Sequence, residues 1–400
     1  MGSAAKRFRP NMSPDEIIAA MNINNLGKAE KRPPEEEEKK LIEEFKKLLL
    51  ESTQRKQILE QYLYLQDHPI THFDKKLKLD FEIQKIRFHV LHGDMEAAEE
   101  TVKDVQLYLD VLDEEQKYYY YKHLGNFSYA QGEYKHAFEY YQKAEKDYKD
   151  SFSSLELGDL YYSLGISASQ FFETDKSLKY TEMALKIYQQ EFIPKRITEC
   201  HINLGVAQSR LRNFKTAIDH NHAALKIAQE LNNNMLRFST EYNYGYIYFQ
   251  FQNYQLAIEH ISKSLQFLPP EYLTDYFMSY NTLIKAAYEL GDIEQALYWL
   301  ECGKRLALNS ELEENNNKSV KEVYTEFMVL NYLLENEEDK YEETILNYWI
   351  PLVEDRNHFY DLGYYYNQLG NFYLKRLEYE KAAHMLNKAS KSFQKLFTTN

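Results

Sequence analysis

The sequence contains few residues that interrupt helices and few that cross-link a chain. Glycine occurs 13 times and proline 9 times in 400 residues, which argues against an all-β or loop-rich fold and favours long helices. The two cysteines, Cys200 and Cys302, form neither a CxxC pair nor a metal-ligand spacing, so we expect buried free thiols in a reducing compartment. No run of 18 apolar residues and no signal-peptide hydrophobic region occurs, so we expect a cytoplasmic chain without a membrane span.

The sequence also lacks the short motifs of common enzymes. No GxGxxG, P-loop, HExxH or GxSxG pattern occurs. The histidines are scattered over predicted helices, and His220 and His222 are two residues apart, which places them on different helix faces rather than as a ligand pair. We therefore expect no catalytic residue, no metal site and no cofactor. The formal charge of −14 argues against broad phosphate-backbone binding by the whole chain.

Tyrosine, by contrast, is abundant, with 36 residues, and one tyrosine-rich stretch explains the organisation of the chain. Residues 119–144 predict two short amphipathic helices joined by a turn at 131–133. Gly125 and Ala137 stand where two helix backbones must approach closely, and Tyr141 fills the space between them. This is the pattern of a tetratricopeptide (TPR) helix pair, so most tyrosines are expected to pack between repeats.

The same unit recurs at a constant spacing that is somewhat longer than the usual TPR period. Each first helix carries a glycine, at Gly125, Gly165, Gly205 and Gly245. Each second helix carries two small residues seven apart: Ala137 and Ala144, Ser177 and Ala184, Ala217 and Ala224, Ala257 and Ser264. Weaker copies occur upstream and downstream. We predict an all-α fold, a right-handed TPR superhelix of about seven or eight helix pairs with a short N-terminal helical extension.

Composition along the chain predicts three regions. Residues 1–34 resemble an expression tag followed by a flexible basic segment, for which a nucleic-acid contact is the less favoured interpretation. Residues 35–78 form an N-terminal helical segment, with one strong helix predicted over 35–66. Residues 79–396 form the repeat array, interrupted by a polar loop at 311–318 and containing a degenerate unit at 321–350.

The predicted binding site follows from this array. First helices line the concave face of a TPR superhelix, and that groove typically holds an extended peptide. An Asn amide offers a donor and an acceptor that match a peptide backbone, and a cation can take a carboxylate. For each Asn the alternative is a hydrogen bond to the neighbouring unit. Counting from the first unit predicts a peptide-binding set of Arg87, Lys122, Asn126, Tyr162, Asn203, Tyr242, Asn243, Tyr246, Asn281 and Asn367.

These repeats resemble those of a known family. Segments such as EYKHAFEYYQKAEKDY (133–148) and NYQLAIEHISKSLQFL (253–268) are similar to repeats of the cytoplasmic peptide-pheromone receptors of Gram-positive bacteria, the Rap, NprR and PlcR group. The resemblance covers residues 80–396, and the NprR branch is the most similar. It implies a quorum-sensing receptor that binds a short signalling peptide and switches a transcriptional or sporulation output. It also implies that groove Asn residues hold the peptide backbone, with Asn126, Asn203, Asn243 and Asn281 as candidates.

The resemblance leaves the output open between two branches. In the NprR and PlcR branch, DNA is bound through an N-terminal helix-turn-helix domain, for which residues 1–35 are too short, so DNA binding would need a domain absent here. In the Rap branch, an N-terminal helical bundle inhibits a response regulator or removes its phosphate, a role for which Gln54, Gln57 and Gln61 are candidates. A general TPR scaffold that binds a longer protein segment is the third interpretation. We also expect a homo-oligomer.

Overall fold

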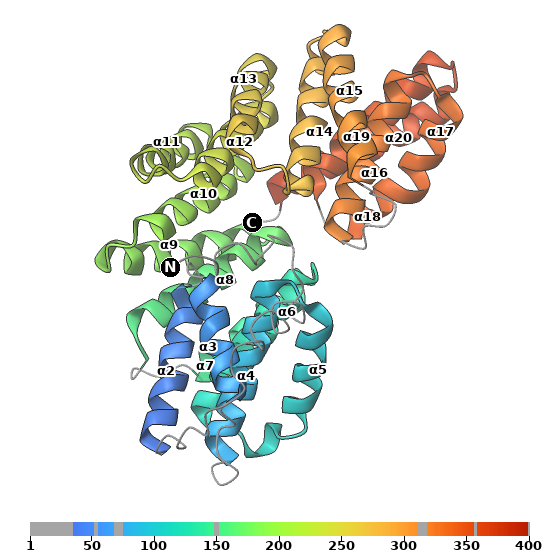
Figure 1. The fold of residues 1–400 in the computed structure, drawn as a ribbon. Coiled ribbons are helices and arrows are strands. Elements are labelled where there is room, and N and C mark those ends of the chain that lie inside the picture. Colours follow the sequence, from blue (N-terminus) through green and yellow to red (C-terminus); the bar gives the residue numbers. More distant parts are fainter. Residues whose placement is uncertain are drawn as a thin grey trace. The chain divides into compact units, whose positions relative to one another are not determined.

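The described part of the chain is built from helices. The computed structural model describes residues 35–51, 55–67, 75–147, 152–310, 318–355 and 358–398, and these contain no β-strand (Figure 1). The predicted tag and basic segment at 1–34, Gln54 and the loop residues 311–317 lie outside this part. Within it, no helix combines the length and the apolar character that crossing a membrane requires. The chain divides into two compact units, residues 1–81 and 82–400.

The N-terminal unit packs its helices around three aromatic rings. It consists of α2 (Glu35–Glu51), α3 (Arg55–Asp67) and the first residues of α4 (Lys75–His92). The rings of Phe45, Tyr62 and Phe81 lie with centroids 6.1–6.5 Å apart. The prediction of one helix over 35–66 is wrong, because α2 and α3 are separate helices in contact. In a straight helix, Phe45 and Tyr62 would be about 25 Å apart and could not share this core.

The second unit is a series of helix pairs, which confirms the predicted all-α fold of TPR-type repeats. Over residues 114–289, each helix packs against its partner and against the next pair. After α4 come α5 (Met95–Gln106), the 3₁₀ turn η1 (Leu109–Val111), α6 (Glu114–Ala130), α7 (Tyr134–Asp147), α8 (Ser154–Gln170), α9 (Thr174–Gln190), α10 (Pro194–Arg210), α11 (Phe214–Glu230), α12 (Asn234–Gln250), α13 (Tyr254–Ser264), η2 (Leu265–Phe267), α14 (Leu273–Glu289), α15 (Ile293–Asn309), α16 (Lys318–Leu334), α17 (Glu338–Thr344), the π-helical turn η3 (Ile345–Trp349), α18 (Ile350–Asp355), α19 (Phe359–Lys375) and α20 (Tyr379–Thr398).

The glycines that recur along the array mark close backbone contacts. A Cβ atom added at Gly205 would lie 2.3 Å from Nδ2 of Asn221, and one at Gly245 would lie 2.2 Å from Cγ1 of Ile261. In both cases the obstructing residue stands sixteen positions later, on the second helix of the pair. The predicted small residues of the second helices, from Ala137 to Ser264, are fully buried. The helices therefore approach too closely for larger side chains at these positions.

The turns inside the pairs repeat a left-handed backbone conformation. Gly132, Phe172, Arg212 and Gln252, at equivalent positions of four consecutive pairs, all have φ between 62° and 80°. A residue of positive φ directly after a helix lets its N–H and the next one bond back to the last turn, which ends the helix. In the turn after α12, the amide of Gln252 donates to the carbonyl of Phe249 at 2.9 Å. Only the first of these four turns uses glycine, the residue that adopts this conformation without strain.

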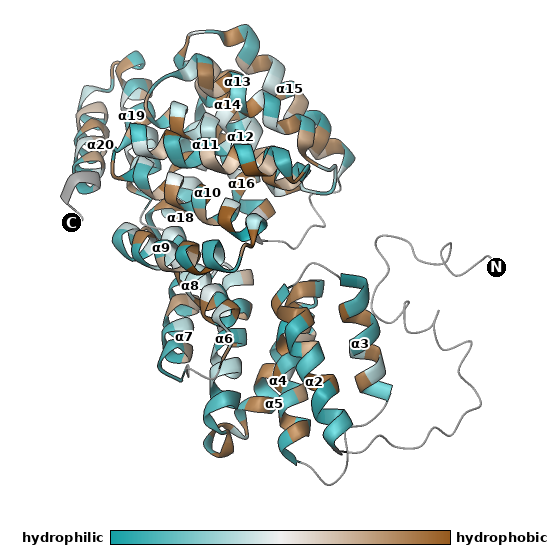
Figure 2. Cartoon of the chain, turned by 90° about the vertical axis from the view of Figure 1, so that its left-hand side faces the viewer, coloured by the Kyte–Doolittle hydropathy of each residue, from teal (hydrophilic) through white to brown (hydrophobic). Residues whose placement is uncertain are grey.

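Apolar and polar residues are interspersed along the helices of the array (Figure 2). The degenerate unit predicted at 321–350 departs from the others in its second helix, which consists of α17, η3 and α18. Tyr341 occupies the position of the small residue and is 1% exposed. Cys200 is buried as expected, whereas Cys302 is only half-buried.

Candidate functional site

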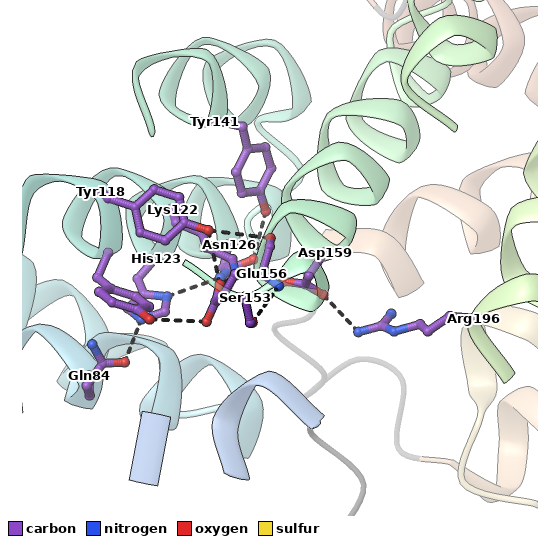
Figure 3. A network of polar contacts seen from close by, with 11 residues as sticks. Gln84, Tyr118, Lys122, His123, Asn126, Tyr141, Ser153, Glu156, Asp159 and Arg196 are labelled. Atoms are coloured by element: carbon purple, nitrogen blue, oxygen red, sulfur yellow. Dashed lines mark hydrogen bonds and ion pairs between the residues drawn. The ribbon is translucent and has the colours of Figure 1, made fainter. Parts of the chain in front are cut away.

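A buried ion cluster joins the first helices of three consecutive pairs. Lys122 comes from α6, Glu156 and Asp159 from α8, and Arg196 from α10, and Figure 3 shows their side chains pointing toward one another. Nζ of Lys122 contacts the carboxylate of Glu156 and lies 3.1 Å from Asp159, and Arg196 lies 2.9 Å from Asp159 on its other side. Lys122, Glu156 and Asp159 are each less than a tenth exposed. The cluster therefore fixes the three helices relative to one another.

The charges in this cluster compensate the cost of burial. Burial alone would raise the pKa of Asp159, but the positive charges of Lys122, Arg196 and Arg87 lower it to about 2. Burial would likewise lower the pKa of Lys122, and the two carboxylates beside it raise it instead. Buried charges of opposite sign at hydrogen-bond distance hold each other ionised. Lys122 and Asp159 are both charged at neutral pH.

A second set of hydrogen bonds extends the cluster along α6. Nε2 of His123 lies 2.9 Å from Oε1 of Gln84 on α4, and the hydroxyl of Tyr141 on α7 donates to Oδ1 of Asn126 at 2.8 Å. Tyr118 donates to the carboxylate of Glu156 at 3.0 Å. All these side chains are buried, so the network is part of the protein interior (Figure 3).

Arg87 differs from the other cations of this region. It occupies the position in α4 that Asn126 occupies in α6, counted back from the turns at Gly93 and Gly132. Its side chain is half-buried, and among the described residues it has no hydrogen-bond or ion-pair partner within range. Burial lowers its pKa, against the attraction of Asp159. A desolvated guanidinium without a close partner is a binding group for an anion such as a carboxylate.

A similar ion cluster lies further along the array. Lys285 on α14 donates to Glu326 on α16 at 2.6 Å, and Tyr365 on α19 donates to the same carboxylate at 2.5 Å. Lys285 and Glu326 are each less than a tenth exposed. Here too a lysine of one first helix meets an acid of the next first helix.

Half-buried tyrosines lie on two first helices of the array, α8 and α12. The rings of Tyr242 and Tyr246, one turn apart on α12, are stacked with centroids 6.3 Å apart. Tyr162 on α8 lies under the guanidinium of Arg196, 5.3 Å from it. All three tyrosines are half-buried, and burial raises the pKa of each. We call the half-buried residues Arg87, Tyr162, Arg196, Tyr242, Tyr246 and Asn367 the first-helix face.

The predicted asparagines do not form one continuous ladder. Both amide hydrogens of Asn203 are used by α9, at 3.2 Å from Ser177 and 2.7 Å from Thr181. Asn281 is fully buried, and its amide donates to the carbonyl of Val323 and to Glu326, both at 2.9 Å. In this structure these amides cannot also donate to a peptide. For Asn203 and Asn281 the alternative interpretation, a bond to a neighbouring unit, describes the contacts.

Of the remaining predicted residues, two are buried and bonded inside the protein and two are half-buried. Asn126 is 9% exposed and bonded to Tyr141, and Lys122 is neutralised by two carboxylates of the chain itself, so neither offers a free group to a ligand carboxylate. Asn243 is half-buried and donates to the carbonyl of Ser239 in its own helix at 2.7 Å. Asn367 is half-buried on α19.

Sequence reasoning missed the acids and Arg196, although a signal was present. Glu156 and Arg196 occupy equivalent positions of consecutive repeats. Both precede the predicted groove residues of their helices, Tyr162 and Asn203, by more than one turn. Charged residues at buried repeat positions need partners, and the adjacent repeat is the nearest source of them. Reading each register position across all repeats would have paired these residues.

The fold and this face define a class of protein, a TPR-type helical repeat with a separate N-terminal helical unit. Within that class, the chain has the fold of Rap and NprR receptors. A Rap protein complexed with competence and sporulation factor matches with a TM-score of 0.75 at 17% identity, over 92% of this chain and 100% of that one. NprR in complex with its cognate peptide NprX matches with a TM-score of 0.70 at 18% identity, over 92% of this chain and 98% of NprR.

The chain is similar to two further proteins. Aspartyl phosphate phosphatase F from Bacillus subtilis matches with a TM-score of 0.60 at 19% identity, over 92% of this chain and 97% of that one. The transcriptional activator NprA of Geobacillus stearothermophilus is 36% identical over 93 residues, a segment that spans 23% of this chain and 23% of that activator. No protein-family model matches the chain.

Proposed function

We propose that this protein is a cytoplasmic receptor that binds a short signalling peptide on the first-helix face and thereby switches a transcriptional or sporulation output. The observation that carries the proposal is the first-helix face itself, where a partly desolvated arginine without a close partner and half-buried aromatic rings follow one another along the array. Two proteins of the same fold were solved in complex with a signalling factor or a cognate peptide, which supports the same use here.

The chemistry of the face fits an extended peptide with a negative group. Arg87 would take a carboxylate of the peptide through paired N–H donors, because its guanidinium has no such partner within the described residues. The stacked rings of Tyr242 and Tyr246 would bury an apolar side chain. Asn243 and Asn367 are the two predicted asparagines that remain half-exposed, and they would bond the peptide backbone.

The proposal is tested by calorimetric titration of the full chain with short free peptides of the signalling type and with longer segments that contain the same sequences. A receptor for a free peptide binds the short form at least as tightly as the long form. A general TPR scaffold, the third interpretation of the sequence, would bind only the longer segments with measurable affinity. The latter outcome would replace the proposal with the scaffold interpretation.

A second candidate function is binding of a response regulator, with inhibition or removal of its phosphate. It is favoured by the match to aspartyl phosphate phosphatase F, which extends over 92% of this chain and so reaches beyond the repeats. The N-terminal unit would supply the contact, and Gln57 and Gln61 on α3 are the described candidates for orienting a water. An unchanged lifetime of a phosphorylated response regulator in the presence of the protein would eliminate the phosphatase activity. The expected homo-oligomer stays a prediction.

A further inference from the structure

Two histidines of the array lie in contact with each other, and neither belongs to the first-helix face. Nδ1 of His201 on α10 lies 3.0 Å from Nδ1 of His220 on α11, and the two ring centroids are 5.3 Å apart. Both side chains are half-buried. Because the two residues come from different helices, 19 positions apart, no local spacing in the sequence pointed to them.

The packing of the two helices of a pair brings these two positions into contact. The corresponding positions in the pairs on either side are also in contact: Tyr161 with Tyr180, whose ring centroids are 6.0 Å apart, and Glu241 with His260, at 2.8 Å. Close to the histidines, α10 and α11 meet at Gly205, where a Cβ would lie 2.3 Å from Asn221. The two imidazoles, tilted by 40° to one another, are therefore held close together by rigid packing, and this is the pre-organisation that a chelating site needs.

Burial disfavours the charged form of both rings. Burial, with a smaller contribution from the charge of His220, lowers the pKa of His201 to about 4. Burial also lowers the pKa of His220, although the nearby carboxylates of Glu182 and Asp219 oppose it. Neutral imidazole is the form that binds metals, and the two exposed carboxylates add a favourable field for a cation.

The distance between the two nitrogens indicates which coordination geometry, and so which metal ion, the pair would favour. With metal–nitrogen bonds of about 2.0–2.1 Å, two ligand nitrogens lie about 2.9 Å apart at a right angle and about 3.4 Å apart at the tetrahedral angle. The observed 3.0 Å matches the right angle. Square-planar and octahedral sites with nitrogen ligands are typical of Cu²⁺ and Ni²⁺.

We propose that His201 and His220 form a two-imidazole binding site for a late first-row divalent cation, Ni²⁺ or Cu²⁺, that bridges α10 and α11. In the described residues no group of three or more His, Cys, Asp or Glu side chains is arranged to hold a metal, so water completes the coordination. This site is independent of the proposed peptide receptor function, because neither histidine belongs to the first-helix face.

Calorimetric titration of the full chain with Ni²⁺ tests the site. The wild-type protein is expected to bind one equivalent, and His201→Ala and His220→Ala are each expected to weaken binding at least about tenfold, because one of two ligands is lost. His222→Ala is the matched control, since His222 is exposed on the same helix, and it should leave the affinity unchanged. Mg²⁺ should not bind, because it demands oxygen ligands.

A second measurement does not depend on the folding of any variant. X-ray absorption spectroscopy of the wild-type protein with one equivalent of Ni²⁺ should show two imidazole ligands. The proposal is overturned if fewer than two imidazoles are found, if no equivalent binds, or if folded His201→Ala and His220→Ala bind Ni²⁺ as the wild type does. Loss of binding in His89→Ala instead would assign the ion to α4 and contradict the proposal as well.

Discussion

The ammonium of Lys122 lies 3.1 Å from the carboxylate of Asp159, and both groups are buried between first helices of neighbouring repeats. Removing the cation leaves two acids, Asp159 and Glu156, without this partner in the interior. We therefore expect Lys122→Met to lower the free energy of unfolding by about 3–5 kcal/mol. Lys103→Met is the control, because Lys103 pairs with Glu99 at an exposed site, and it should change the stability far less than Lys122→Met does. Chemical denaturation of both variants measures the difference, and equal effects would contradict a structural role for the buried cluster.

The same cluster predicts a dependence of stability on pH. The pKa of Asp159 is lowered to about 2, so its stabilising contribution is complete above the ordinary carboxyl pKa of about 4 and is lost as the pH falls toward 2. The Asp159→Asn variant has no carboxylate at this position, so it has no such contribution to lose in acid. We expect it to be less stable than the wild type by about 2 kcal/mol at pH 7, with the gap closing between pH 4 and pH 2. Denaturation curves across this range test the sign, and a gap that widens in acid would refute it.

The helix glycines differ in how much stability an alanine substitution should cost. Gly245→Ala would force a Cβ to within 2.8 Å of the carbonyl oxygen of Ala257, which is backbone and cannot move aside, so we expect a loss of about 1–3 kcal/mol. At Gly158 a Cβ would meet only side-chain atoms, at 3.1 Å, and alanine gains helix propensity. Gly158→Ala should therefore change stability by less than about 1 kcal/mol. Thermal unfolding that ranks the two variants in the opposite order would be inconsistent with the close-contact account.

The turn after α12 offers a stabilising substitution. Gln252 is exposed and has φ 62°, a conformation that costs a residue with a Cβ about 1–2 kcal/mol and costs glycine almost nothing. We expect Gln252→Gly to raise the free energy of unfolding by about 1 kcal/mol. Gly132→Ala, in the equivalent turn three repeats earlier, should lower it by a similar amount. If both substitutions shift the denaturation midpoint in the same direction, the argument from backbone strain fails.

The repeat architecture could be predicted from the sequence because close packing leaves a local signature. In the regular repeats Gly125, Ala137 and their copies must be small, and the sequence shows their constant spacing directly. The break between α2 and α3 left no comparable signature, because no proline or glycine lies between residues 35 and 67 and the helical pattern continues across it.

The site was harder to predict than the fold, because its contacts join different repeats. Lys122 finds its partners on the next first helix, in Glu156 and Asp159, so counting along one helix could not show that its charge is already neutralised. Asn281 stands at the Lys122 position of its repeat and Asn203 one residue later than that position, so their amides point to neighbouring helices. Arg87, Tyr162, Tyr242 and Tyr246, chosen by the same counting, are half-buried and remain in the proposed site.

The most direct test of the proposed function is the affinity of a tight-binding short peptide for variants of the first-helix face. Arg87→Ala and Tyr246→Ala are each expected to weaken binding at least about tenfold, through loss of a carboxylate partner and of an aromatic contact. Tyr298→Ala is the control, because Tyr298 is exposed on the second helix α15, and it should bind the peptide as the wild type does. Unchanged affinity in correctly folded Arg87→Ala and Tyr246→Ala would contradict the account.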